Sequence, residues 1–288
     1  MTDSDAPRTI LHLIKEGENT LCGNDVPRME AEILLAHTLG KDRSYLRAWP
    51  EQIVSPEYMN QYRRHLGRRR QGHPIAYLTG RQEFWSLELA VNEHTLIPRP
   101  ETELLVEQAL ENIPLDQCLD IADLGTGSGA IALAIAKERP LCRIHASDVS
   151  QDTLTVAENN ARRHQLNNVR FYQGHWFNAF DQQRFHMVLS NPPYIAEHDV
   201  HLTQGDLRYE PRTALTCGLS GLEAIIQIVK SANLFMHPNA WLYLEHGYQQ
   251  ADEIRKVLID QRYAAVKTLR DLNQHERVTQ AQNVVKSS

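Results

Sequence analysis

The stretch Asn191-Pro192-Pro193-Tyr194 combines residue types that could hold a reacting group. It follows an apolar run over residues 185–190 that predicts a short buried strand. Two consecutive prolines allow neither helix nor ladder pairing, so the chain must leave this strand as a rigid, extended turn. The side-chain oxygen of Asn191 and the neighbouring carbonyl can both accept from a planar NH2 group, and Tyr194 offers an aromatic face. The turn therefore predicts a site that aims a conjugated amino nitrogen at an electrophile; the alternative is a surface turn that happens to contain two prolines.

A glycine-rich turn is the second stretch with chemical potential. Residues 119–124 predict a strand, Gly125-Thr126-Gly127-Ser128-Gly129 follow at once, and residues 130–136 open a helix of strong helix formers. A strand, a glycine-rich turn and a helix form the first unit of a doubly wound α/β domain. Glycines let the backbone come close to a ligand, and the helix amino terminus favours negative charge nearby. A helix-capping turn in an ordinary α/β unit is the alternative.

The spacing of these glycines favours one cofactor over another. It is Gly-x-Gly-x-Gly rather than the dinucleotide pattern Gly-x-Gly-x-x-Gly, and Asp123 stands two places before the first glycine. This suits S-adenosylmethionine, which has a cationic amino acid end and no pyrophosphate. A second predicted strand, residues 143–147, ends at Asp148. That position is about 20 residues beyond the loop, where an acidic side chain accepts from ribose hydroxyls.

Composition places the chain among ordinary globular proteins. Of its 288 residues, 42% are hydrophobic and 23% charged, and the net charge of −6 gives no nucleic-acid-binding balance for the chain as a whole. The acidic start predicts no signal peptide, and no apolar run approaches the roughly 20 residues of a membrane helix. The four cysteines are far apart and fit neither a disulfide framework nor a zinc pattern. We therefore expect a reduced, cytoplasmic protein.

A metal site is not expected. His198 and His201, with Glu197, could suggest one, but no cysteine or further well-spaced histidine supports them. Histidine pairs in polar loops are common without any metal.

The chain predicts three regions. Residues 1–72 predict a small helical bundle, because apolar positions recur at helical spacing in three segments, residues 9–15, 25–40 and 55–70. Residues 73–98, punctuated by Gly80, predict a β-hairpin linker. Residues 99–288 alternate strands and helices, which predicts a mostly parallel, doubly wound α/β sheet with ligands at the carboxyl ends of its strands. Further strands are expected at residues 168–172, 240–244 and 263–269 and from residue 277, and further helices at residues 152–164 and from residues 221 and 248.

A basic cluster lies at the end of the third predicted helix. Its members are Arg63, Arg64, Arg68, Arg69 and Arg70, with His65 among them. They predict a docking face for an acidic partner or for RNA, or a solvated helix face.

Taken together, these residues resemble the release-factor glutamine methyltransferase family, often called PrmC or HemK. The resemblance covers nearly the whole chain and rests on His73-Pro74-Ile75-Ala76-Tyr77, Ile97-Pro98-Arg99-Pro100-Glu101-Thr102-Glu103, residues 123–129, residues 191–194 and Glu245-His246-Gly247. It implies a Rossmann-like, class I S-adenosylmethionine-dependent methyltransferase. It also implies methylation of the side-chain amide nitrogen (N5) of the glutamine in the Gly-Gly-Gln motif of class I peptide chain release factors, with S-adenosylhomocysteine as product. A monomer that binds neither DNA nor a membrane is expected.

The resemblance also implies roles for single residues. The implied cofactor-binding residues are Asp123, Gly125, Thr126, Gly127, Ser128, Gly129, Asp148 (ribose), Trp176 (adenine) and Asn191. The implied substrate-binding residues are Asn191, Pro192, Pro193, Tyr194, Arg99 and Glu101, of which Asn191, Pro192 and Tyr194 are catalytic. His175 departs from the aspartate often found before this tryptophan, which leaves a polar contact to adenine open at that position. Trp176 could also be a plain core aromatic, and the tail after Arg277 departs from the family's usual ending without an assigned role.

Three other functions compete with this interpretation. Adenine-N6 and cytosine-N4 DNA methyltransferases share the Asn-Pro-Pro-Tyr turn, but they would need a basic DNA cleft, and the carboxyl-terminal part is acidic. A non-catalytic S-adenosylmethionine-binding module would have no need of an amide-holding turn. A nicotinamide oxidoreductase is disfavoured by the glycine spacing.

Overall fold

The computed structural model describes residues 8–203 and 205–284. The chain divides into two compact units that meet in sequence between Gly80 and Arg81. The division of the chain into regions 1–72, 73–98 and 99–288 stays a prediction.

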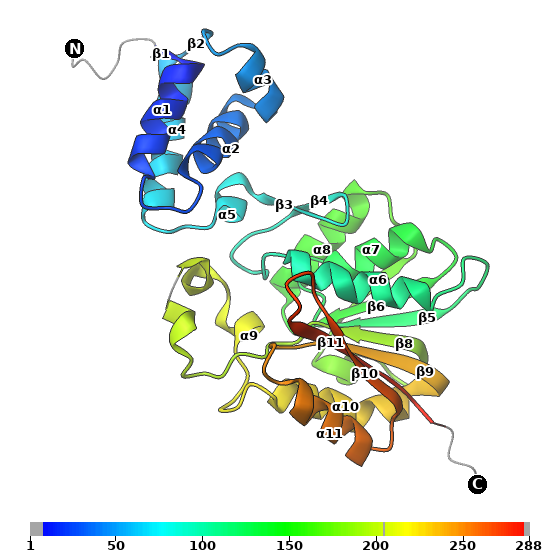
Figure 1. Cartoon of the computed structure of the whole chain (residues 1–288). Coiled ribbons are helices and arrows are strands. Elements are labelled where there is room, and N and C mark those ends of the chain that lie inside the picture. Colours follow the sequence, from blue (N-terminus) through cyan, green and yellow to red (C-terminus); the bar gives the residue numbers. More distant parts are fainter. Residues whose placement is uncertain (1–7, 204, 285–288) are drawn as a thin grey trace. The chain divides into compact units, whose positions relative to one another are not determined.

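The amino-terminal unit is a helical bundle (Figure 1). Two-residue strands β1 (Arg8–Thr9) and β2 (Ile53–Val54) pair antiparallel beside the helices. The helices are α1 (Ile10–Thr20), α2 (Pro27–Leu39), α3 (Arg43–Ala48), α4 (Pro56–Arg70) and α5 (Ile75–Thr79). Leu13, Leu34 and Tyr62 belong to one buried core that these helices share. The three predicted helical segments correspond to α1, α2 and α4.

A glycine lets two helices of this bundle approach closely. A Cβ atom at Gly17 of α1 would lie only 2.0 Å from the hydroxyl of Tyr62 in α4 and 2.7 Å from the Cβ of Ala31 in α2. The Tyr62 hydroxyl is buried and donates to the carbonyl of Leu13 at 3.2 Å. The absent side chain at Gly17 therefore makes room for this hydrogen bond.

The predicted hairpin is present but shorter than expected. Strands β3 (Arg81–Phe84) and β4 (Leu87–Ala90) pair antiparallel, and Trp85 and Ser86 form the turn with φ of 51° and 54°. Two left-handed residues suit a two-residue hairpin loop. Residues 75–79, by contrast, form helix α5 rather than a strand. This helix ends at a left-handed Gly80 and buries Leu78 in the helical core.

The carboxyl-terminal unit contains a seven-stranded sheet in the order β10-β11-β9-β8-β5-β6-β7. Its strands are β5 (Asp120–Leu124), β6 (Arg143–Asp148), β7 (Val169–Gln173), β8 (Phe185–Ser190), β9 (Met236–Glu245), β10 (Ala264–Arg270) and β11 (Glu276–Gln282). The pairs from β7 through β9 are parallel, whereas β11 is antiparallel to both β9 and β10. The predicted α/β fold with a mostly parallel sheet is confirmed. Strand order reverses between β5 and β8, and such switch points are where α/β sheets bind ligands.

Helices cover both faces of this sheet (Figure 1). Helices α6 (Glu103–Glu111), α7 (Ala130–Glu138) and α8 (Gln151–Arg163) lie on one face, and α10 (Glu223–Phe235) and α11 (Ala251–Asp260) lie on the other. Alternate strand residues point to opposite layers, as Ile121 and Ala122 of β5 do. Short elements complete the unit: η2 (Pro100–Thr102), η3 (Trp176–Ala179), η4 (Val200–Thr203), η5 (Gly205–Tyr209) and α9 (Arg212–Leu215).

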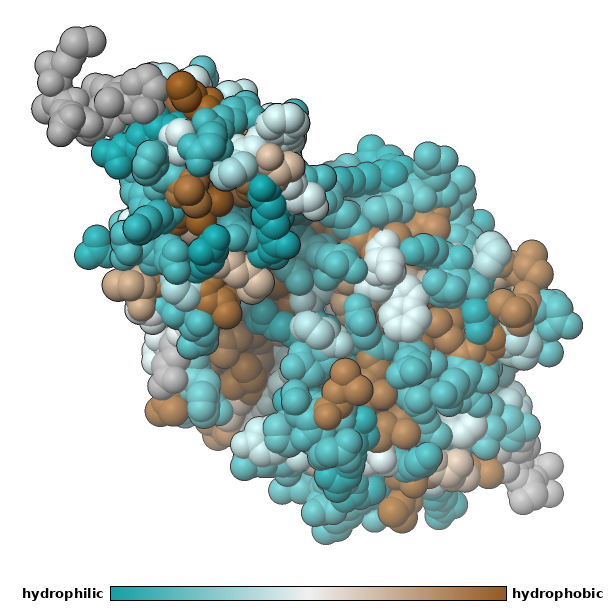
Figure 2. Space-filling model, turned by 45° about the horizontal axis from the view of Figure 1, so that its top comes forward, coloured by the Kyte–Doolittle hydropathy of each residue, from teal (hydrophilic) through white to brown (hydrophobic). Residues whose placement is uncertain are grey.

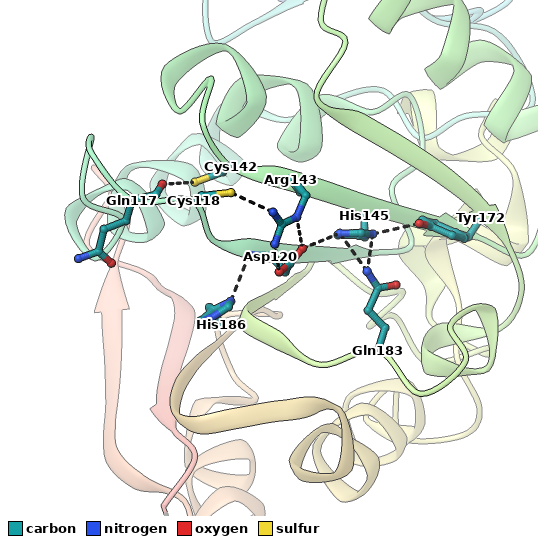
Figure 3. Close-up of polar contacts among 9 residues, drawn as sticks. All are labelled: Gln117, Cys118, Asp120, Cys142, Arg143, His145, Tyr172, Gln183 and His186. Carbon is teal, nitrogen blue, oxygen red and sulfur yellow. Dashed lines mark hydrogen bonds and ion pairs between the residues drawn. The ribbon is translucent and has the colours of Figure 1, made fainter.

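A polar network crosses neighbouring strands of the sheet (Figure 3). The carboxylate of Asp120 accepts from Arg143 at 2.7 Å and lies 3.2 Å from Nε2 of His145. The other ring nitrogen of His145 lies 3.1 Å from the hydroxyl of Tyr172 and 3.0 Å from the amide nitrogen of Gln183. These contacts connect β5, β6 and β7 with the segment that precedes β8.

The surface in Figure 2 is mostly hydrophilic, with hydrophobic residues exposed singly or in small groups. Such scattered exposure is normal for a globular protein. Within residues 8–203 and 205–284, no helix is both long and apolar enough to span a membrane.

Candidate active site

The glycine-rich turn joins β5 to α7 in a conformation that its glycines make possible. Gly125, Gly127 and Gly129 have φ of 73°, 58° and 87°, a region in which other residues are strained. The amide of Gly125 donates to the carbonyl of Ser147 at the end of β6 at 2.9 Å. A Cβ atom at Gly125 would lie 3.2 Å from the ring of Trp176, so a larger residue would press on that ring.

The Asp123 carboxylate binds the glycine-rich turn through hydrogen bonds. It is fully buried, and its Oδ2 accepts from the hydroxyl of Thr126 at 2.7 Å and from the amide of Ala132 at 3.2 Å. Its Oδ1 has no hydrogen-bond partner among the described residues. Burial raises the pKa of this carboxyl to about 7. The side chain does not line the cavity beside the turn.

A cavity of about 370 Å³ lies at the carboxyl ends of the parallel strands. Gly125, Gly127, Asp148, Trp176 and Asn191 line it, which brings together predicted residues from four separate segments. Its size is within the range of small-molecule sites. Thr126, Ser128 and Gly129 do not line it, and Gly129 instead packs close to Leu133 and Ala157.

Asp148 ends β6 with its carboxylate at the cavity. Oδ2 accepts from the amide of Gly127 at 3.1 Å, and Oδ1 accepts from the amide of Ser150 at 3.0 Å. Burial raises the pKa of this carboxyl, and the backbone amides oppose that rise. These amides fix the carboxylate, which has further lone pairs for a ligand's hydroxyl groups.

An aromatic wall lines the cavity near Gly125. Trp176 begins η3 with a left-handed φ of 50°, and its indole Nε1 is buried without a hydrogen-bond partner among the described residues. His175 is exposed, lines the same cavity and lies 5.2 Å from the Trp176 ring, centroid to centroid. The tryptophan therefore lines the cavity while it also packs against the hydrophobic core, and its contact with adenine stays a prediction.

The Asn-Pro-Pro-Tyr turn leaves the carboxyl end of β8 as predicted. Asn191, Pro192, Pro193 and Tyr194 line a second, smaller cavity of about 60 Å³. Asn191 and Pro193 line both cavities. Nδ2 of Asn191 donates to the hydroxyl of Thr102 at 3.1 Å.

The predicted substrate residues Arg99 and Glu101 have different surroundings. Arg99 lines the smaller cavity and is ion-paired with Glu210, whose side chain is fully buried. Glu210 also accepts from the amide of Ile97 at 3.0 Å. Glu101 lines neither cavity, but its charge acts on Tyr194.

Several lining residues were not expected from the sequence. Six of them come from two segments, before η2 and around α9: His94, Leu96, Thr213, Ala214, Thr216 and Cys217. They have no motif of their own, and only their position in the fold identifies them. Elsewhere, His201 lies 2.6 Å from Asp199, and the described part of the chain contains no cluster of three or more potential metal-ligating side chains.

Two protein-family descriptions match the chain. Residues 12–80 match the PrmC N-terminal domain, and residues 100–207 match the methyltransferase small domain.

Similar proteins match over nearly the whole length. The release factor glutamine methyltransferase of Salmonella typhimurium is 47% identical over 268 residues, which are 93% of this chain and 96% of that protein. The enzyme of the same name from Pseudomonas aeruginosa is 47% identical over 274 residues, 95% of this chain and 98% of that protein. A solved methyltransferase from Pyrococcus furiosus shares the fold, with a TM-score of 0.54 and 17% identity over 69% of this chain and 90% of that one.

Proposed function

This chain belongs to the release factor glutamine methyltransferase family, and we propose that it methylates the glutamine side-chain amide nitrogen in the Gly-Gly-Gln motif of class I peptide release factors. One observation carries the proposal: Asn191 stands between two cavities, and lines both of them. The larger cavity has the glycine turn and Asp148, and the smaller one has the Asn-Pro-Pro-Tyr turn.

The methyl donor is S-adenosylmethionine, and the larger cavity has groups that fit it. The Asp148 carboxylate would accept from its ribose hydroxyls, and the face of Trp176 would lie against its adenine. The space beside Gly127 is open, since nothing described lies within 4 Å of a Cβ position there, so a ligand can approach its backbone closely. At Gly125 the Trp176 ring lies 3.2 Å from that position. Thr126, Ser128, Gly129 and Asp123 would then shape the turn rather than contact the donor directly. When bound, S-adenosylmethionine supplies a methyl group already activated on a sulfonium.

The protein's own contribution is alignment of a weak nucleophile. An amide nitrogen reacts poorly because its lone pair is delocalised into the carbonyl. Asn191 Oδ1 and the carbonyl of Pro192 are two acceptors for the two N–H groups of the target. Held by both, the nitrogen would turn its lone pair toward the larger cavity. These acceptors would also stabilise the positive charge that grows on nitrogen in the transition state.

The side chains beyond the turn would bind the rest of the target. Tyr194 offers its ring to the flat amide group. Arg99 and Glu210 hold the segments before η2 and before α9 together, so we assign Arg99 a role in shaping the smaller cavity. Glu101 lies outside both cavities, and its part in substrate binding stays a prediction.

The change Asn191→Ala tests this mechanism. We expect kcat on a class I release factor to fall about 100-fold or more, because both the acceptor and the alignment are lost. The dissociation constant for S-adenosylmethionine, measured by calorimetry, should change by less than about threefold, since the larger cavity keeps its other groups. A variant that methylates at the wild-type rate would refute the role of Asn191.

The family resemblance also sets the expected partners. We propose a monomer that acts in the cytoplasm on release factors and not on DNA. Labelled methyl transfer to release factor and to duplex DNA, measured side by side, separates this from a DNA amino-methyltransferase. Methyl transfer to DNA at a comparable rate would overturn the proposal.

A further inference from the structure

A buried carboxyl group lies directly beside the Asn-Pro-Pro-Tyr turn. Glu245 ends β9, the parallel neighbour of β8, and is 1% exposed. The hydroxyl of Tyr194 lies 3.5 Å from its Oε1. The hydroxyl of Thr102 is close enough to stabilise the ionised carboxyl, which opposes the rise of its pKa on burial. Its Oε2 has no hydrogen-bond partner within the described part of the chain. A buried carboxyl group with an unpaired oxygen lowers the stability of the folded state, so its presence at this position suggests a function.

Thr102 connects this acid to Asn191. It ends η2, is 4% exposed, and its oxygen lies 3.1 Å from Nδ2 of Asn191. A hydroxyl has one proton to donate. The nearby Glu245 carboxyl is the acceptor that suits this proton, which leaves the oxygen of Thr102 to accept from Nδ2 of Asn191. The group of Asn191 that faces it must therefore be the NH2.

This hydrogen-bond direction decides which way the Asn191 amide points. The two ends of a carboxamide have similar shape, so packing alone does not choose between them. A reversed Asn191 would turn its NH2 toward the target NH2, placing donors against donors. With NH2 held by Thr102, Oδ1 is left as an acceptor, and it accepts no hydrogen bond from any residue the structure describes.

We propose that Thr102 and Glu245 are positioning residues that fix the Asn191 carboxamide with its oxygen toward the target amide. The same carboxyl also accepts from the hydroxyl of Tyr194 at 3.5 Å, at the other end of the turn from Asn191. This inference rests on the proposed function, because it assigns how that reaction's acceptor is oriented.

The change Thr102→Val removes the hydroxyl and keeps the shape. We expect kcat on a class I release factor to fall about tenfold or more, with KM for release factor and the dissociation constant for S-adenosylmethionine changed less than about threefold. Thr102→Ser should restore kcat to within about threefold of wild type.

Thr279→Val is a matched control: Thr279 is fully buried in the same sheet, and its hydroxyl contacts His246 at 2.8 Å rather than Asn191. The control should keep kcat within about twofold. A wild-type kcat in Thr102→Val, or no rescue by Thr102→Ser, overturns the proposal.

The pH dependence of kcat distinguishes a role of the Glu245 charge from an effect of side-chain packing. Arg277, Glu101 and Tyr194 are the charged or titratable groups that act on Glu245, and burial raises the pKa of Glu245 to about 7. The ionised carboxyl is the stronger acceptor for the Thr102 proton and has no proton of its own to donate to Thr102, so kcat should rise with pH through neutrality. Glu245→Gln should remove this rise. An unchanged pH profile in Glu245→Gln contradicts the role of the carboxyl.

A spectroscopic test separates this inference from the proposed function. In protein labelled with 15N-asparagine, the Asn191 side-chain NH2 signals are identified by their loss in Asn191→Asp. In the wild type, one of these protons should exchange slowly with solvent because it is held by Thr102, and Thr102→Val should speed its exchange. Equal exchange in both proteins overturns the positioning role. A wild type that leaves release factor unmethylated refutes the proposed function, while the spectrum still tests the orientation of Asn191.

Discussion

At the scale of single residues, burial sets the behaviour of three carboxyl groups near the site. It raises the pKa of Asp123 and of Glu245 to about 7, and it raises that of Asp148 as well. Asp123 and Glu245 face the protein interior, whereas Asp148 lines the larger cavity. Burial therefore raises the pKa of two carboxyl groups in the interior and of one that lines the cavity, where we propose that it contacts the donor.

Asp148→Ala should weaken donor binding before it affects the chemical step. Loss of a charged acceptor is expected to raise the dissociation constant for S-adenosylmethionine about tenfold or more, with kcat at saturating donor largely kept. Calorimetry measures the change. Asp152→Ala is a matched control, because Asp152 is an exposed acid in the first turn of α8. Equal affinities in the two variants would remove Asp148 from the donor site.

The sequence motifs identify the principal groups of the site but not the residues that contact them. The contents of the glycine turn, Asp148 and the Asn-Pro-Pro-Tyr turn were predictable, because each follows a recognisable strand. Thr102 lies 89 residues from Asn191 in the chain, so its contact follows only from the fold. Glu210 is a similar case, since its partner Arg99 is 111 residues away.

At the scale of elements, the strands and helices around the site follow from local patterns, but their packing does not. Apolar alternation and turn residues predicted β5, β6 and β8 within about a residue of their ends. The same signal failed for α5, where alternating apolar residues form a helix because Leu78 is buried in the helical core. The close approach at Gly17 also had no sequence signal.

Two glycine substitutions in the bundle should have opposite effects. Gly17→Ala should lower the free energy of unfolding by about 1–3 kcal/mol, because the new methyl group would meet the Tyr62 hydroxyl. Gly67→Ala in α4 should raise it by about 0.5–1 kcal/mol, since alanine favours helix and no described atom lies within 4 Å of the new methyl. Urea unfolding followed by circular dichroism measures both. Equal shifts would contradict the close packing at Gly17.

The strand network around His145 should make stability depend on pH. Burial lowers the pKa of His145 below the ordinary value of 6.5. The unfolded chain then binds a proton that the folded chain does not, so the contribution is present above pH 6.5 and is lost as pH falls through the lowered pKa. The free energy of unfolding of the wild type should therefore fall relative to that of His145→Gln between pH 7.5 and 5.5. Parallel curves for the two proteins would contradict this.

At the scale of the whole molecule, an acidic chain has a local basic surface on α4. Arg63 is ion-paired with Glu16 at 2.6 Å, and Arg69 with Glu30 at 2.7 Å. Arg64, Arg68 and Arg70 are exposed and remain for a partner. Of the five arginines of the predicted docking face, we therefore assign only these three to binding a partner.

Replacing Arg64, Arg68 and Arg70 together with glutamine tests this face. We expect KM for release factor to rise about tenfold with kcat unchanged, because the three charges would act on association and not on the reaction. Added salt should raise KM in the wild type more than in the variant. Replacing Lys230, Lys256 and Lys267 with glutamine removes the same charge from exposed positions of the other unit. An equal rise of KM in both proteins would indicate a net-charge effect. No rise of KM in the arginine variant would show that the cluster is only a solvated face of α4.

The most direct test of the central claim is to locate the methyl group itself. A class I release factor is incubated with this protein and S-adenosylmethionine, digested, and its peptides are sequenced by fragmentation mass spectrometry. We predict one added methyl group on the side-chain nitrogen of the Gly-Gly-Gln glutamine, and none when the Asn191→Ala variant replaces the wild type. An unmodified glutamine, or a methyl group carried by another residue, would contradict the proposal that this turn presents a glutamine amide to the donor.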